Sequence, residues 1–371
     1  MNYTIAIIPG DGIGPEVTAQ AKKALDAIAE EFDHRFTYTE ALMGACAIDK
    51  TGNPLPEETI DICENADAIL FGAIGDPKYD NDPNAKVRPE QGLLRLRKAL
   101  GLFCNLRPVK AYEQLIENSP LKREIISGTD ISIYRELTGG IYFGEKKLSK
   151  DGKTAYDGCE YTVAEIARIA HLAFAEAQKR RKKLTLVDKA NVLETSRLWR
   201  KTVTAIGKDY PDVALDFLFV DNAAMQMILN PRQFDVILTE NLFGDIISDE
   251  ASVIGGSIGL LASASIGKKN ALFEPIHGSY PQGAGKDIAN PLASILSAAM
   301  LLRHLKLDKE AMTIEAAVEK SLDLGFSTED INSENPFSTS KVGDFIADYI
   351  LNPEDTNRNF QNIFVGQSTI I

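Results

Sequence analysis

Short apolar segments typical of strands alternate with amphipathic segments typical of helices through most of this 371-residue chain. The predicted strands lie at residues 3–8, 68–73, 131–135, 184–187, 215–220 and 236–238, and helices are predicted after several of them. Strands that alternate with helices pair in parallel, because a parallel connection needs a long crossover. The pattern therefore predicts an α/β protein built on a largely parallel sheet.

The charge balance excludes two classes of partner. The chain has 53 acidic and 40 basic residues, a net charge of −13, so we expect neither nucleic acid nor an anionic membrane surface as a ligand. The longest uncharged stretch, residues 251–267, is shorter than the roughly 20 apolar residues of a membrane span. The four cysteines lack metal-ligand spacing, which predicts free thiols in a cytoplasmic protein.

A glycine-rich loop joins the first predicted strand to a helix. Gly10, Gly12 and Gly14 alternate with other residues, so the loop departs from the dinucleotide-binding fingerprint, whose last two glycines are three apart. Pro15 and Glu16 then suit the first turn of a helix. A ligand-binding loop and a tight strand-to-helix turn are both compatible with this local pattern.

Two aspartates form a candidate metal site. Asp245 and Asp249 lie four residues apart in a predicted helix at 245–254, so both carboxylates project from one face. A hard divalent cation such as Mg²⁺ or Mn²⁺ takes carboxylate oxygens and relieves their repulsion. Asp221 follows a predicted strand directly and could supply a third oxygen. The competing interpretation is a solvated acidic face.

Several arginines could bind a polyanionic substrate. Arg97 lies in Leu-Arg-Leu-Arg, Arg107 in Asn-Leu-Arg-Pro, and Arg135 ends an apolar strand. A guanidinium group holds a carboxylate through two parallel hydrogen bonds. Each arginine alone could equally be structural. Together they predict a substrate with more than one carboxylate.

Tyr142 and Lys189 are candidates for proton transfer. Tyr142 lies in residues 140–144, a predicted extended segment that is followed by a polar arm at 149–161. Lys189 lies where a strand ends and a helix begins, a position from which it could act as a base. The alternative for Lys189 is an ordinary surface lysine. The basic run 179–183 is predicted to be a solvated helix end.

The motifs together resemble the β-decarboxylating dehydrogenases of the isocitrate/isopropylmalate dehydrogenase family. The resemblance covers nearly the whole chain and rests on the segments at residues 9–16, 93–98, 105–108, 135–140, 142–144, 188–193, 220–224, 241–249 and 274–279. It implies an enzyme that oxidises a 2-hydroxy-3-carboxy acid with NAD and then expels carbon dioxide.

The resemblance also implies roles for individual residues. Asp245 and Asp249, with Asp221 of a partner subunit, would hold Mg²⁺ or Mn²⁺. Lys189, also from the partner, would act on the hydroxyl proton, and Tyr142 would supply a proton to the enolate carbon. The carboxylates of the substrate would be bound by Arg97, Arg107 and Arg135.

The implied fold is not a Rossmann fold. It has two domains on one continuous mixed sheet: a discontinuous cofactor-binding domain at residues 1–103 and 256–371, and a domain at 104–255 for dimerisation and for metal and substrate binding. The arm near 149–161 would interlock with its partner. The expected assembly is a homodimer with shared active sites.

Three residues bear on the substrate, which is a small molecule. Glu90, Leu93 and Leu94 match the place where family members contact the third arm of the substrate, and two leucines there suit an isopropyl group. We therefore expect 3-isopropylmalate, a substrate of leucine biosynthesis. Tartrate or D-malate, and homoisocitrate, are the alternatives within the family, and a non-catalytic ligand-binding relative is the alternative from another class.

The expected cofactor segment departs from the family at one position. The residues implied in NAD binding are His277, Gly278, Ser279, Gln282, Asn290 and Asp330. NAD-dependent relatives commonly have an aspartate where this chain has Gln282. A neutral amide can bond a ribose hydroxyl but does not repel a 2′-phosphate. NAD is therefore predicted to be preferred over NADP by a smaller margin than in relatives with the aspartate.

Overall fold

The computed structural model describes residues 1–80 and 86–354. They form two compact units, which we call the terminal unit and the central unit. The terminal unit comprises residues 1–80, 86–100, 259–263 and 269–354; the central unit comprises residues 101–258 and 264–268. The family resemblance implies domain boundaries after residues 103 and 255. The structure differs most at 264–268, which join the central unit because they belong to a strand that pairs with strand β4 of that unit.

The main sheet has ten strands in the order β2-β1-β3-β12-β11-β4-β5-β10-β8-β9. Strand β4 runs antiparallel to β5 and β11, whereas β1–β2, β1–β3, β12–β3, β10–β5, β10–β8 and β8–β9 are parallel pairs. The prediction of an α/β fold on a mixed, largely parallel sheet is confirmed.

The terminal unit builds its part of the sheet from the beginning and the end of the chain. Its strands are β1 (Asn2–Gly10), β2 (Arg35–Glu40), β3 (Ala68–Ala73) and β12 (Ala271–Pro275), and β11 (Ala262–Ile266) begins in this unit and ends in the other. Its helices are α1 (Gly14–Glu31), α2 (Ala45–Thr51), α3 (Glu57–Asn65), α4 (Pro77–Asp80), α5 (Pro89–Ala99), α11 (Leu292–His304), α12 (Asp308–Asp323) and α13 (Thr339–Leu351).

The central unit contains the remaining strands and helices. Its strands are β4 (Cys104–Lys110), β5 (Asp130–Glu136), β8 (Lys183–Asp188), β9 (Ala214–Phe219) and β10 (Val236–Thr239), with a separate hairpin of β6 (Lys146–Leu148) and β7 (Ala155–Asp157). Its helices are α6 (Arg123–Ile126), α7 (Val163–Lys179), α8 (Glu194–Gly207), α9 (Val220–Leu229) and α10 (Asn241–Ser252).

Each face of the central sheet has its own apolar cluster, because side chains alternate along a strand. On one face, Leu186 packs with Phe174 of α7 and Trp199 of α8. On the other face, Ile133 belongs to a cluster with Met227 of α9 and Ile247 of α10. On strand β5, the side chains at every second position from Ile133 therefore point towards α9 and α10.

Local signals explain where two helices begin. Thr162 and Glu165 form a reciprocal capping box at the start of α7. Pro15 occupies the first turn of α1, as predicted. The preceding glycine loop is a tight strand-to-helix turn: Gly10 has φ +74°, and a Cβ there would lie 1.9 Å from the carbonyl oxygen of Ala73.

Three local predictions are wrong. Residues 140–142 form a short 3₁₀ turn and not an extended segment, because Gly140 has φ +75°. Helix α10 begins at Asn241, before the predicted start at residue 245, so both aspartates lie inside the helix and not at its end. In the run 179–183, Arg180 is not simply solvated, because its guanidinium bonds the carboxylates of Asp130 and Asp235 at 2.9 and 2.8 Å.

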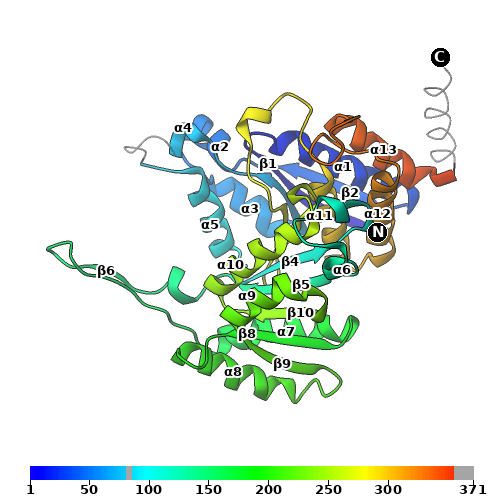
Figure 1. Ribbon diagram of the computed structural model, residues 1–371. Helices are drawn as coiled ribbons and strands as arrows, with labels where there is room; N and C mark the ends of the chain where they lie inside the picture. The colour runs from blue at the N-terminus through cyan, green and yellow to red at the C-terminus, as the bar shows by residue number, and fades with distance from the viewer. Residues whose placement is uncertain (81–85, 355–371) are drawn as a thin grey trace. The chain divides into compact units, whose positions relative to one another are not determined.

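The predicted arm contains the β6–β7 hairpin, which extends from the body of the central unit as a thin ribbon (Figure 1). Its strands, Lys146–Leu148 and Ala155–Asp157, consist of exposed residues. The four cysteines are free thiols. In the part of the chain that the structure describes, no helix is both long enough and apolar enough to cross a membrane.

Candidate active site

Strands β4 and β5 direct two arginines towards helix α10. Val109 and Ile133 belong to the apolar cluster beneath α9 and α10. Arg107 and Arg135 lie two residues away from them on the same strands. Because side chains two residues apart share a face of a strand, both arginines point towards α10.

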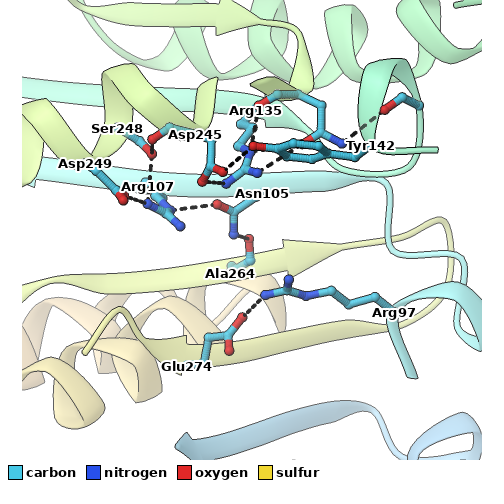
Figure 2. Close-up of polar contacts among 12 residues, drawn as sticks. Arg97, Asn105, Arg107, Arg135, Tyr142, Asp245, Ser248, Asp249, Ala264 and Glu274 are labelled. Atoms are coloured by element: carbon cyan, nitrogen blue, oxygen red, sulfur yellow. Dashed lines mark hydrogen bonds and ion pairs between the residues drawn. The ribbon is translucent and has the colours of Figure 1, made fainter. Parts of the chain in front are cut away.

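Arg135, Asp245 and Tyr142 form one group on this face (Figure 2). Nη1 of Arg135 lies 2.5 Å from Oδ1 of Asp245, and the Tyr142 hydroxyl donates to Oδ2 of the same carboxylate at 2.8 Å. Arg135 is buried, whereas Tyr142 is 41% exposed. Partial burial, together with the hydrogen bond to Asp245, raises the pKa of Tyr142. The phenol therefore keeps its proton at neutral pH.

Arg107 makes a second pair with the same helix. Its Nη1 donates to the hydroxyl of Ser248 at 2.8 Å and to the carboxylate of Asp249. Asp249 remains 67% exposed at its side chain, whereas Arg107 is 15% exposed. The two predicted substrate arginines of the central unit are thus each paired with one of the two predicted metal ligands.

Lys189 and Asp221 form a separate pair in the central unit. Lys189 follows the last residue of β8, and Asp221 lies in the first turn of α9. The Nζ atom of Lys189 bonds Oδ1 of Asp221. This hydrogen bond, and secondarily the amide dipoles of the helix start, lower the pKa of Asp221. The lysine is therefore held by an acidic partner and is not an isolated surface cation.

The carboxylates of α10 have the donor chemistry of a hard divalent cation but do not complete a site. Asp245 and Asp249 project from one helix face, and carboxylate oxygens are the preferred ligands of Mg²⁺ and Mn²⁺. Among residues 1–80 and 86–354, no group of three or more His, Cys, Asp or Glu side chains could hold a metal ion.

In the terminal unit, helix α5 carries the predicted specificity residues. Glu90, Leu94 and Arg97 follow one another at intervals of four and three residues, which places them along one side of the helix. Leu94 is 57% exposed, and Leu93 beside it is half-buried. Arg97 donates to Oε1 of Glu274 on β12 at 2.7 Å (Figure 2). An apolar surface thus lies one helical turn from a guanidinium group.

The predicted cofactor segment follows β12. Nδ1 of His277 lies 3.0 Å from the carbonyl oxygen of Gly278, and burial lowers the pKa of His277, so the imidazole is neutral at pH 7. The carbonyl of Ser279 accepts from the amide of Ile13 at 2.8 Å, which joins the segment to the glycine loop.

Two further predicted cofactor residues contact each other. Asn290 donates to Oδ2 of Asp330 at 3.0 Å, and the Thr328 hydroxyl donates to Oδ1 of Asp330 at 2.6 Å. Gln282 lies in the turn Pro281–Gly283 and is exposed. The structure thus fixes the carboxylate of Asp330 and leaves the amide of Gln282 on the surface.

Comparison with known proteins assigns the chain to a family. The model of the isocitrate/isopropylmalate dehydrogenase family matches residues 4–346. The chain belongs to that family. A protein named 3-isopropylmalate dehydrogenase from Bacteroides fragilis is 54% identical over 352 residues, which are 94% of this chain and 99% of that protein. One of the same name from Wolinella succinogenes is 55% identical over 351 residues, which cover 94% and 98% of the two chains.

Solved structures of the isocitrate/isopropylmalate dehydrogenase type share the fold. An isocitrate dehydrogenase from Methylococcus capsulatus superposes with a TM-score of 0.83 at 35% identity, covering 94% of this chain and 99% of that one. A β-decarboxylating dehydrogenase from Thermococcus kodakarensis gives a TM-score of 0.79 at 37% identity, with 94% and 96% covered.

Two further residues of the site are not among those predicted from the sequence. Asn105 and Asn241 each contact one of the arginines described above. Both stand inside segments that carry the family resemblance. Asn105 also lies two residues before Arg107 on a strand, and this spacing is a signal that places the two side chains on one face. No comparable local signal exists for Asn241, which lies 106 residues from Arg135.

Proposed function

We propose that the protein catalyses the NAD-dependent oxidative decarboxylation of 3-isopropylmalate to 4-methyl-2-oxopentanoate, a step of leucine biosynthesis. The observation that carries this proposal is the match to proteins named 3-isopropylmalate dehydrogenase, at 54% to 55% identity over 94% of the chain. Helix α5 is consistent with it, because the exposed Leu94 offers an apolar surface to an isopropyl group.

The arginines bind and orient the substrate. A guanidinium group holds a carboxylate in one plane through paired hydrogen bonds, and the central unit presents Arg107 and Arg135 on one face of its sheet. Arg97 on α5 would bind a carboxylate next to the apolar surface of Leu93 and Leu94. Discrimination by that surface amounts to roughly 1–3 kcal/mol per methylene group.

Two residues move protons. Lys189 would accept the proton of the substrate hydroxyl as the carbon that carries this hydroxyl is oxidised by loss of a hydride to NAD. Tyr142, which keeps its proton at neutral pH, would then donate a proton to the carbon that has lost carbon dioxide. NAD supplies the hydride acceptor, and we place it against residues 277–290 and Asp330 of the terminal unit. Asp245 and Asp249 would hold Mg²⁺ or Mn²⁺, which supplies Lewis-acid stabilisation of negative charge on the substrate oxygens.

We further propose a homodimer in which each active site takes Lys189 and Asp221 from the partner. Two observations support it. The first is that a proposed base and a carboxylate, Lys189 and Asp221, form a pair apart from the proposed proton donor and the two carboxylates of α10. Within the described chain, no third carboxylate joins Asp245 and Asp249. Helices α9 and α10 also expose large apolar side chains: Met225, Ile228, Leu229 and Ile246.

A substrate panel tests the activity. Steady-state rates with NAD and Mg²⁺ should give the highest kcat/KM for 3-isopropylmalate among 3-isopropylmalate, isocitrate, homoisocitrate, D-malate and tartrate. A higher kcat/KM for another acid would reassign the substrate within the family. No NADH formation from any of the five acids would indicate a non-catalytic ligand-binding protein.

A further inference from the structure

Arg107 and Arg135 each lie between an aspartate of α10 and a buried asparagine. Oδ1 of Asn241 accepts from Nη2 and Nε of Arg135 at 3.0 and 3.3 Å, and the main-chain carbonyl of Asn241 accepts from Nε at 3.0 Å. Nη1 of the same arginine bonds Asp245. The guanidinium group is thus bonded on two sides, by a neutral amide and by a carboxylate.

Arg107 repeats this arrangement with different residues (Figure 2). Its Nε donates to Oδ1 of Asn105 at 2.8 Å, while its Nη1 bonds Ser248 and Asp249. Both arginines therefore offer Nε to a carboxamide oxygen and Nη1 to a carboxylate of the same helix. Because Nε is taken, the plane of each guanidinium group is set before any substrate arrives.

The asparagines are themselves fixed. Nδ2 of Asn105 donates to the carbonyl oxygen of Ala264 at 3.3 Å, and Nδ2 of Asn241 donates to that of Gly139 at 3.1 Å. Their exposed fractions are 2% and 1%. In each case the amide nitrogen needs an acceptor and the amide oxygen faces a cation, so only one orientation of the carboxamide satisfies both ends.

We propose that Asn105 and Asn241 are positioning residues for the substrate carboxylates, and that their neutrality is as important as their geometry. This inference rests on the proposed function. A carboxylate in place of either amide would still accept from Nε, but it would oppose the positive charge that the substrate needs. The amide orients the guanidinium group and leaves its charge for the ligand.

The two asparagines differ in what else they hold. Gly139, which accepts from the side-chain amide of Asn241, lies in the turn that leads to Tyr142. Ala264, which accepts from Asn105, lies on strand β11. A change at Asn241 should therefore disturb both substrate binding and the proton donor, whereas a change at Asn105 should act on binding alone.

The test uses the isosteric variants Asn105→Asp and Asn241→Asp. Calorimetric titration with 3-isopropylmalate and Mg²⁺, without NAD, should show Kd raised roughly tenfold or more, the range of one charged hydrogen bond. In steady-state assays, Asn105→Asp should raise KM with little change in kcat, whereas Asn241→Asp should raise KM and lower kcat. Asn270→Asp is the matched control, because Asn270 is also buried and donates to a main-chain carbonyl at 3.1 Å.

A double-mutant cycle distinguishes positioning of Arg107 from simple packing, and it remains informative if an Asp variant fails to fold. Asn105→Ser should weaken substrate binding several-fold when residue 107 is arginine. The loss should be much smaller in an Arg107→Lys background, because lysine has no Nε donor for Asn105 to orient. Equal losses in both backgrounds would overturn the inference for Asn105, as would unchanged Kd in folded Asp variants. A wild type that does not bind 3-isopropylmalate would instead overturn the proposed function.

Discussion

The Tyr142 hydroxyl donates a 2.8 Å hydrogen bond to the carboxylate of Asp245, which is also bonded to Arg135. This carboxylate, itself a candidate metal ligand, thus joins a candidate proton donor to a candidate substrate-binding cation. Partial burial and this hydrogen bond both favour the neutral phenol and raise the pKa of Tyr142. Tyr142 is therefore suited to donate a proton and is a poor base.

Removing this hydroxyl should abolish proton donation but not folding. Tyr142→Phe is expected to lower kcat by ~10²–10⁴-fold, the range for general acid–base catalysis. In the wild type, loss of activity through ionisation of Tyr142 should occur only above the ordinary tyrosine pKa. Tyr79→Phe is the matched control, because Tyr79 also donates to an aspartate, Asp49, at 2.7 Å on the surface. Equal kcat in Tyr142→Phe and wild type would place the donor elsewhere.

Activity should depend on a divalent cation. The two carboxylates of α10 are the proposed ligands, so EDTA should abolish NADH formation and excess Mg²⁺ or Mn²⁺ should restore it. Asp249→Asn should raise the metal concentration for half-maximal rate, because one anionic oxygen is lost. Asp344→Asn, which removes a surface ion pair with Lys23, should leave that concentration unchanged. Full activity in chelator would exclude the metal role.

The proposed shared sites can be tested by complementation. Tyr142→Phe and Lys189→Met should each be nearly inactive as homodimers. In a hybrid dimer the two changes segregate, so one of the two sites is intact and activity should return in part. Subunit exchange is checked by native mass spectrometry. Exchange without recovery, or a fully active monomer, would rule out shared sites.

The cofactor preference should respond to Gln282. The wild type is expected to prefer NAD over NADP, because Asp330 is fixed by Asn290 and offers a carboxylate near the proposed ribose site. Gln282→Asp adds a second negative charge and should widen the preference, chiefly by lowering kcat/KM for NADP. The measurement is kcat/KM for both cofactors in both proteins. A wild type that favours NADP would contradict the prediction.

The buried carboxyl of Glu240 should make stability depend on pH. Burial raises the pKa of Glu240 from 4.5 to about 7, although the Ser196 hydroxyl, 2.9 Å away, partly offsets this. Below pH 4.5 the carboxyl is protonated in both the folded and the unfolded protein, so it does not lower the free energy of unfolding. Between pH 4.5 and 7 it ionises in the unfolded protein before it ionises in the folded protein. The free energy of unfolding therefore falls by up to roughly 3 kcal/mol over this interval.

Glu240→Gln should remove this dependence, because an amide oxygen can still accept from Ser196. Denaturant unfolding of both proteins at pH 5 and pH 8 measures the effect. The variant should gain stability relative to the wild type at pH 8 and gain much less at pH 5. A constant difference between the two pH values would show that Glu240 does not titrate in this interval.

Much of the fold could be predicted from local sequence. The capping box of Thr162 and Glu165 and the proline at position 15 act within one helical turn, so their effects do not depend on the rest of the chain. The spacing of Asp245 and Asp249 likewise places both carboxylates on one helix face, wherever the helix begins. These features need only bond geometry and helix periodicity.

Only the tertiary structure decided which side chains meet. The segment that leads to Tyr142 is a turn and not the predicted extended segment, because Gly140 adopts a positive φ. A Cβ at this position would lie 2.2 Å from the Tyr161 hydroxyl. Arg180 is paired with an aspartate 55 residues away, and Asn241 is brought to Arg135 across 106 residues. The sequence by itself determined the elements and the chemistry that each carries, because periodicity and capping are short-range. The partners of each charged group depend on how the sheet places distant segments side by side, which no local pattern encodes.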